Sequence, residues 1–559
     1  MSTERQVKRS QFLLESAVHQ ASAKLSLAHL WVAFIALLLG AIAGLLQTLV
    51  RNGVIEVPFG IGYYQLLTAH GVLLALIFTT FFIFGFVIAG LGKTTGSLTL
   101  AVRRLGWSGF WTMTAGTALG VVMILQNEAT VLYTFYAPLQ ASPWYYIALT
   151  LIVVGSWFSG AAVCLQYAHW KKVHKGKLSP LFSFMAVVTM LMWFVATLGV
   201  AATVLFQFIP WSFGWVESIN ILLSRTLFWY FGHPLVYFWL LPAYMCWYVI
   251  IPKIIGGKVF SDALARIAFI LLFLFAIPVG FHHQLLESGI SPFWKYLQVV
   301  LTFMVVIPSL MTAFSMFATF ELTGREKGAK GMFGWLKKLP WGDARFFAPM
   351  MGMIVFIPAG AGGLINASFQ LNQVIHNTMW VVGHFHLTVG TSVALTFFGA
   401  AYWLVPYLTG RKRTKILNRL GIIQTILWTI GMFFMSSAMH VSGLLGAPRR
   451  TDLTTYGDHP VALSWIPYKT AMAIGGSLLF FAILIFIFIM IRSAFFSPRG
   501  NEEFPIAEPN PASGSTPKFL DNWNLWIAIS IILIVLAYIV PVIEMIQYAP
   551  PGSPGFKLW

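Results

Sequence analysis

The chain is poor in cysteine, with only Cys164 and Cys246 among 559 residues, and both lie within apolar runs. Two cysteines exclude a disulfide framework and a cysteine-rich metal site. A dinuclear copper centre needs two close thiolates, so this chain alone is not expected to build one.

Charged residues are also scarce. They make up 9% of the chain, whereas 58% of the residues are hydrophobic, and a soluble domain carries roughly 25% charged residues. This composition predicts a polytopic membrane protein. The first 27 residues are polar and lack the apolar core and cleavage site of a secretory signal. The net charge of +18 is assigned to the loops, where basic residues set topology, so no nucleic-acid partner is expected.

Long apolar runs fill the rest of the chain, and a spanning helix needs roughly 20 residues. We predict an all-α polytopic membrane protein with about 13 transmembrane helices enclosing its site. The runs lie near 28–49, 64–92, 106–126, 144–170, 180–210, 222–252, 264–285, 295–321, 346–370, 376–407, 418–445, 463–492 and 522–548. The predicted units are an N-terminal segment (1–27), a twelve-helix core (28–492), a linker (493–521), and a thirteenth helix with a tail (522–559). The linker is expected to be flexible, because 499–521 is rich in Pro, Ser and Glu.

The connecting loops alternate in charge. Those after predicted helices 2, 4, 6, 8 and 10 are basic, whereas loops 127–143, 211–221 and 371–375 contain no Lys or Arg. By the positive-inside rule, the N-terminus and the linker are cytoplasmic and the C-terminus is external.

Six histidines lie inside the apolar runs. His384 and His386 are two residues apart, so on a helix they point about 200° apart and face opposite sides. The other four are His70, His233, His282 and His283. The predicted topology places all six in the outer half of the bilayer. One buried histidine is more often a satisfied polar residue, but six at one depth indicate metal binding.

Two spacings sharpen this interpretation. His233 and Tyr237 are four residues apart, on one helix face. His282 and His283 are adjacent, and Pro278 and Gly280 precede them, so a distorted helix end would let both imidazoles reach one ion. Three neutral imidazoles suit copper or iron.

The motifs that carry these histidines resemble subunit I of the haem–copper oxygen reductases, and the likeness covers most of the chain. They are GHPLVYFWLLPAY at 232–244, PVGFHHQ at 278–284, HNTMWVVGHFH at 376–386 and PRR at 448–450. The thirteenth helix and Tyr237, Tyr244 and Tyr248 resemble the B-type branch. Leu235 stands where the A-type branch commonly has a glutamate that serves a second proton channel.

The resemblance implies a cofactor set. His70 and His386 would ligate a low-spin haem, expected to be of b type, and His384 a high-spin haem of a or o type. His233, His282 and His283 would bind the copper ion called CuB, and Tyr237 resembles the tyrosine cross-linked to the first copper histidine. Residues expected near the haem propionates are Arg449, Arg450, His376 and Asn377, and Asn372 replaces a frequent aspartate.

Hydroxyl-bearing residues suggest a proton path from the cytoplasm. Tyr237, Tyr244 and Tyr248 recur on one face of the sixth predicted helix. Ser309, Thr312 and Ser315 follow at every third residue of the eighth, and Ser261 lies just past the inner end of the sixth. The alternative is that these hydroxyls only bond back to helix carbonyls.

The resemblance predicts a terminal oxidase of a prokaryotic plasma membrane that reduces O₂ to water, takes up protons and pumps them. The expected partners are O₂, membrane lipid, a subunit II with a dicopper site fed by a cytochrome c-type donor, and a small additional membrane subunit. A quinol donor remains an alternative. Nitric oxide reductase of the same superfamily and a histidine-relay transporter are the rival functions.

Overall fold

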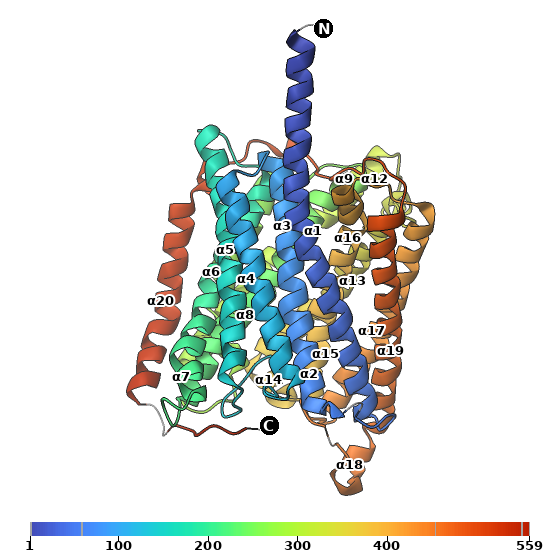
Figure 1. Cartoon of the computed structure of the whole chain (residues 1–559). Coiled ribbons are helices and arrows are strands. Elements are labelled where there is room, and N and C mark those ends of the chain that lie inside the picture. Colours follow the sequence, from blue (N-terminus) through green and yellow to red (C-terminus); the bar gives the residue numbers. More distant parts are fainter. Residues whose placement is uncertain (1–2, 58–59, 453, 549–551, 558–559) are drawn as a thin grey trace.

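The computed structural model describes residues 3–57, 60–452, 454–548 and 552–557, and within 3–21 it describes the backbone only. The described residues form a helical bundle with isolated β-bridges and no β-strand. In Figure 1 the N-terminal helix projects beyond one end of the bundle, and the C-terminus lies at the other end.

The α-helices are α1 (Thr3–Arg51), α2 (Tyr63–Gly71), α3 (Thr79–Thr95), α4 (Leu100–Leu125), α5 (Pro143–Val173), α6 (Leu181–Thr203), α7 (Ile209–Ser212), α8 (Ile221–Met245), α9 (Ile251–Ile254), α10 (Asp262–Ala276), α11 (Pro292–Met304), α12 (Val306–Glu326), α13 (Ala344–Ala367), α14 (Phe369–Ile375), α15 (Met379–Leu387), α16 (Ala394–Thr409), α17 (Lys415–Leu444), α18 (Pro460–Leu463), α19 (Ile466–Ile491) and α20 (Trp523–Gln547). Five π-helices continue them: η2 (Val72–Phe78), η3 (Val204–Phe208), η4 (Cys246–Ile250), η7 (Thr388–Val393) and η9 (Arg492–Phe496). The 3₁₀ turns are η5 (Phe281–His283), η6 (Gly334–Lys338), η8 (Tyr456–Asp458), η10 (Pro511–Ser513) and η11 (Lys518–Asp521).

Twelve helical segments of the described chain are long and apolar enough to span a membrane. The predicted fold class is confirmed, and the predicted count of about 13 is close. The segment that falls short is the one predicted at 264–285. Its helix α10 has 15 residues, which at 1.5 Å per residue is too short to cross the hydrocarbon core. An irregular stretch, 277–280, and the turn η5 continue it.

Three π-helices lie at or directly after predicted site residues. η2 follows His70, η7 follows His384 and His386, and η4 contains Tyr248. Wider π-helical turns are frequent at functional sites. The sequence pattern gave no sign of them.

The segment before α20 is packed, so its prediction as a flexible linker is wrong. Phe504 and Leu520 are each 2% exposed. The backbone of this segment bonds the 249–259 region, with the Ala507 N–H donating to the Val249 carbonyl at 2.8 Å. Asp521 then pairs with Lys171 at 2.7 Å and with Arg266 at 3.3 Å. Proline and serine mark irregular backbone, but these side-chain contacts hold that backbone in place.

Helix α1 begins at Thr3, so the N-terminal segment is continuous with the first span and has no helix boundary at residue 27. Helix α20 stands at the edge of the bundle (Figure 1). It is the least enclosed span, with 22% of its apolar window buried, as expected of a helix that mainly faces lipid.

Candidate metal and haem sites

One cavity of about 710 Å³ lies between the helices. All six histidines predicted from the sequence line it: His70, His233, His282, His283, His384 and His386. They come from α2, α8, η5 and α15. The structure therefore brings together residues that are more than 300 positions apart in the chain.

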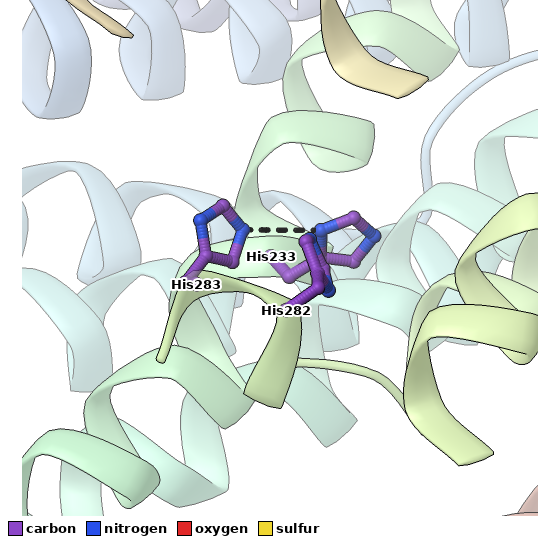
Figure 2. Close-up of side chains that lie close together, drawn as sticks. All are labelled: His233, His282 and His283. Carbon is purple, nitrogen blue, oxygen red and sulfur yellow. Dashed lines mark hydrogen bonds between the residues drawn. The ribbon is translucent and has the colours of Figure 1, made fainter. Parts of the chain in front are cut away.

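Three of these imidazoles form a cluster. One ring nitrogen from each of His233, His282 and His283 lies within 4.8 Å of the other two. Figure 2 shows the His233 and His283 rings facing each other across the gap, with His233 Nδ1 3.3 Å from His283 Nε2. Two nitrogens each about 2 Å from one ion at the tetrahedral angle stand roughly 3.3 Å apart. The cluster therefore fits a single metal ion.

The tautomer of His282 follows from its neighbour Thr302 in α11. The Thr302 hydroxyl donates its proton to the Gln298 carbonyl at 2.7 Å, so it accepts a hydrogen bond from His282 Nδ1 at 3.1 Å. The lone pair of His282 is then on Nε2. Metal-binding histidines commonly donate their other ring N–H in this way, which fixes ring orientation.

The irregular segment that carries His282 and His283 is held by Gln298, which the sequence analysis missed. Its Oε1 accepts from Gly280 N at 2.7 Å and from Phe281 N at 2.8 Å. Its Nε2 donates to the Ala537 carbonyl of α20 at 3.2 Å. These contacts join distant segments, so no local pattern in the sequence pointed to Gln298.

Aromatic residues complete this centre. Trp229 stacks on His283 with ring centres 3.8 Å apart and planes 8° apart. Tyr237 lies 5.0 Å from the His233 ring centre. His233 Nε2 is buried and has no hydrogen-bond partner among the described residues. The 3.3 Å contact directs Nδ1 of His233 at the ion position, so Nε2 is the nitrogen left for Tyr237.

His70 and His386 form a second pair. Their ring centres are 6.2 Å apart and their planes differ by 12°. Two imidazoles bonded to opposite sides of one iron by bonds of about 2 Å place their ring centres roughly 6 Å apart. His70 Nδ1 lies 3.0 Å from the Gly40 carbonyl and His386 Nδ1 2.8 Å from the Val382 carbonyl. Both Nε2 atoms therefore remain available as axial ligands.

His384 lies on the other face of α15, as the two-residue spacing predicts. It packs against α13 at Gly362, where an added Cβ would lie 2.8 Å from His384 Nδ1. Gly44 of α1 gives His70 similar room, since a Cβ there would lie 2.5 Å from its Nδ1. Glycine at both positions lets the backbone approach an imidazole that a side chain would displace.

Arginines border one end of the cavity. Arg449 donates to Asn377 Oδ1 through Nη2 at 2.8 Å. Arg450 places its guanidinium 4.9 Å from the Tyr136 ring centre. Asn377 and Arg450 have positive φ, 59° and 64°, which is uncommon outside glycine and marks a conformation held by its surroundings.

A family profile described as "Cytochrome C and Quinol oxidase polypeptide I" matches residues 24–478. The chain is 40% identical over 558 residues to cytochrome c oxidase subunit 1 of Thermus thermophilus, covering 96% of this chain and 97% of that protein. The chain belongs to this family. A protein named heme-copper oxidase subunit I+III from Aeropyrum pernix is 24% identical over 84% of this chain and 54% of its own length. A cryo-EM structure of a heme-copper terminal oxidase dimer superposes with a TM-score of 0.91 at 35% identity, over 96% of this chain and 95% of that one.

The family resemblance predicted from the motifs is confirmed. This subunit I is the catalytic subunit of a terminal oxidase and an oxidoreductase that crosses the membrane several times. Family membership implies haems and CuB, O₂ as a reactant and a subunit II as a partner. The cavity fits that set, since it offers a three-imidazole cluster, an opposed imidazole pair and one further imidazole.

His376 and Asn372 lie beside the Arg449 end of the oxidase cavity. Asn372 Nδ2 donates to the Asn366 carbonyl at 2.8 Å, so its Oδ1 accepts from His376 Nδ1 at 3.0 Å. Burial, and then the charge of Arg449, lower the pKa of His376 below its usual value.

The predicted proton path is partly connected. The Tyr248 hydroxyl donates to Thr312 Oγ1 at 3.0 Å. Ser309 and Thr312 donate back to helix carbonyls, as hydroxyls in helices often do. Ser315 Oγ and the Tyr244 hydroxyl are buried without a hydrogen-bond partner among the described residues, so both keep an unused hydrogen-bonding position. Ser261 is the N-cap of α10, accepting from Leu264 N at 3.2 Å.

Proposed function

We propose that the residues of this cavity divide into three roles. His70 and His386 hold the low-spin haem, His384 holds the high-spin haem, and His233, His282 and His283 hold CuB. The observation that carries the proposal is the hydrogen-bonding of the ring nitrogens. His70, His386 and His282 each engage Nδ1 with a fixed oxygen, which directs Nε2 into the cavity.

When bound, the two porphyrin irons and the copper supply electron transfer and O₂ chemistry. The protein holds the ligands at fixed separations and excludes bulk water. His384 and His386 are two residues apart on α15, so one helix would hold both haems. The phenol of Tyr237, beside His233, would give one proton and one electron to the oxygen being reduced, and a later electron and proton would restore it.

Protons are proposed to reach Tyr237 through Tyr248 and Thr312, with waters at Ser315 and Tyr244. The direct bond between the Tyr248 and Thr312 hydroxyls supports this route. Ser309 and Ser261 belong to the same proposed path, although Ser261 also has a capping role that accounts for it. Leu235 leaves α8 without a carboxylate for a second channel.

The remaining proposals concern the haem types, the membrane orientation and the partners. We propose a low-spin haem b, a high-spin haem of a or o type, and an external C-terminus with the N-terminus in the cytoplasm. The donor is proposed to be of cytochrome c type, acting through a dicopper subunit II, with a small additional membrane subunit. Proton uptake from the cytoplasm accompanies turnover, and we propose that the enzyme pumps protons.

The decisive experiment is turnover by the purified complex with O₂ and with NO, alongside optical spectra. We expect fast O₂ consumption, much slower NO consumption, and two haem signals of which only the high-spin one shifts with carbon monoxide. His384→Ala should remove the carbon monoxide response and keep the low-spin band. A carbon monoxide response that persists in His384→Ala would overturn the assignment, and NO turnover without O₂ turnover would favour nitric oxide reductase.

A further inference from the structure

Two cations at the Arg449 end of the cavity have no assigned role. Arg51, at the end of α1, and Lys469, in α19, both line the cavity. Arg51 donates to Met379 Sδ and to the Pro448 carbonyl, each at 3.1 Å, while its Nε is buried without a partner. Lys469 Nζ donates to Thr454 Oγ1 at 3.2 Å. Neither forms an ion pair among the described residues.

The cavity is strongly unbalanced in charge. Its lining contains four cations, Arg51, Arg449, Arg450 and Lys469, and among the described residues it contains no Asp or Glu. Asp452 lies near enough for its charge to interact with Arg51, but it does not line the cavity. All four cations are half-buried, and a partly desolvated charge is stabilised by opposite charge nearby. The lining therefore favours anions inside the cavity.

Two haems bring the required charge, because each porphyrin carries two propionate carboxylates. Arg449 and Arg450 are the two cations that the family resemblance already places near the propionates. The other two lie on the side of the opposed imidazole pair. Arg51 ends the helix whose Gly40 carbonyl bonds His70, and Lys469 begins α19, which packs on α1.

We propose that Arg51 and Lys469 bind the propionate carboxylates of the low-spin porphyrin and raise its reduction potential. The proposal rests on the assignment of His70 and His386 to that haem. Reduction adds one electron to the iron, so nearby positive charge favours the reduced form. The Arg51 guanidinium is held in place by Pro448, the residue before Arg449 and Arg450, so the cations form one rim. These two residues position the haem and tune it, and they do not contact O₂.

The test is an optical redox titration of the purified complex, carried out on wild type, Arg51→Gln, Lys469→Gln and Arg51→Lys. The high-spin haem in the same sample is the internal reference. We expect the midpoint potential of the low-spin haem to fall in both glutamine variants, with a smaller change at the high-spin haem. Arg51→Lys keeps the charge and should stay near wild type. Lys330→Gln, which removes an exposed cation outside the cavity, is the matched control and should shift neither potential.

Each outcome bears on the proposal. Unchanged low-spin potentials in Arg51→Gln and Lys469→Gln would overturn it, as would equal shifts in Arg51→Gln and Arg51→Lys. If Arg51→Gln loses the low-spin haem, retention in Arg51→Lys supports a charge role and loss in both contradicts it. Failure of the underlying assignment looks different, because the low-spin band would then be missing from wild type or would survive His386→Ala.

Discussion

Gln298 of α11 links its own helix to the irregular segment before His282 and to α20. Its side chain accepts from two backbone N–H groups just before His282 and donates to the Ala537 carbonyl of α20. Gln298→Leu keeps most of the volume and removes all three hydrogen bonds. Two amides and one carbonyl are then left buried without partners, each costing about 1–3 kcal/mol.

The lower limit of that cost is roughly 3 kcal/mol, which is about a hundred-fold in an equilibrium constant. The segment 277–283 should therefore leave its position, and His282 and His283 should lose the ion while the haem histidines on α2 and α15 are untouched. We expect the copper-to-iron ratio of the purified complex to fall sharply with both haem bands retained. Gln424→Leu is the matched control, because Gln424 is also fully buried, but its hydrogen bond goes to Tyr402 of α16 and not to the segment that carries His282. A normal copper-to-iron ratio in Gln298→Leu would refute this reasoning.

The remaining predictions concern three single substitutions. His386→Ala should remove the low-spin band and keep copper, as read from spectra and metal analysis; an intact band would refute that ligand assignment. Tyr237→Phe should nearly abolish steady-state O₂ reduction with both haems bound, and wild-type turnover would exclude the phenol from the reaction. Asp521→Asn should cost roughly 1–3 kcal/mol of local stability, because Lys171 loses its charged partner while Arg266 keeps Asp262, and it should expose 497–521 to limited proteolysis, with unchanged cleavage as the contrary result. Burial raises the Asp521 pKa, but Lys171, Ser179 and Arg266 outweigh it and hold that pKa below its usual value, so this stability is present above about pH 4 and is lost as the pH falls through the lowered pKa.

The bundle and the principal side chains of the cavity were predictable from the sequence. Apolar runs of membrane length predict the helices. The two-residue spacing of His384 and His386 places their side chains on opposite faces of one helix, independently of the rest of the fold. The adjacency of His282 and His283 predicted a distorted helix end, and the structure has a 3₁₀ turn there.

The parts that were missed depend on contacts between distant segments. Gln298 and Thr302 act on His282 and its neighbours from another helix, which no local pattern reveals. The packed linker depends on Asp521 meeting Arg266 and Lys171, so its polar composition was misleading. The π-helical turns after His70 and His386 follow from packing around the cavity and leave the apolar pattern unchanged.

The most direct test is to measure the number of haems and copper ions per copy of this chain in the purified, fully assembled complex. The copper of a dicopper centre in any co-purifying subunit II is subtracted from the total. The six imidazoles that share one cavity predict two haems and one copper per chain, with His233→Ala losing copper and keeping both haems. A preparation that turns over O₂ with a single haem, or with no copper held by this chain, would contradict the account.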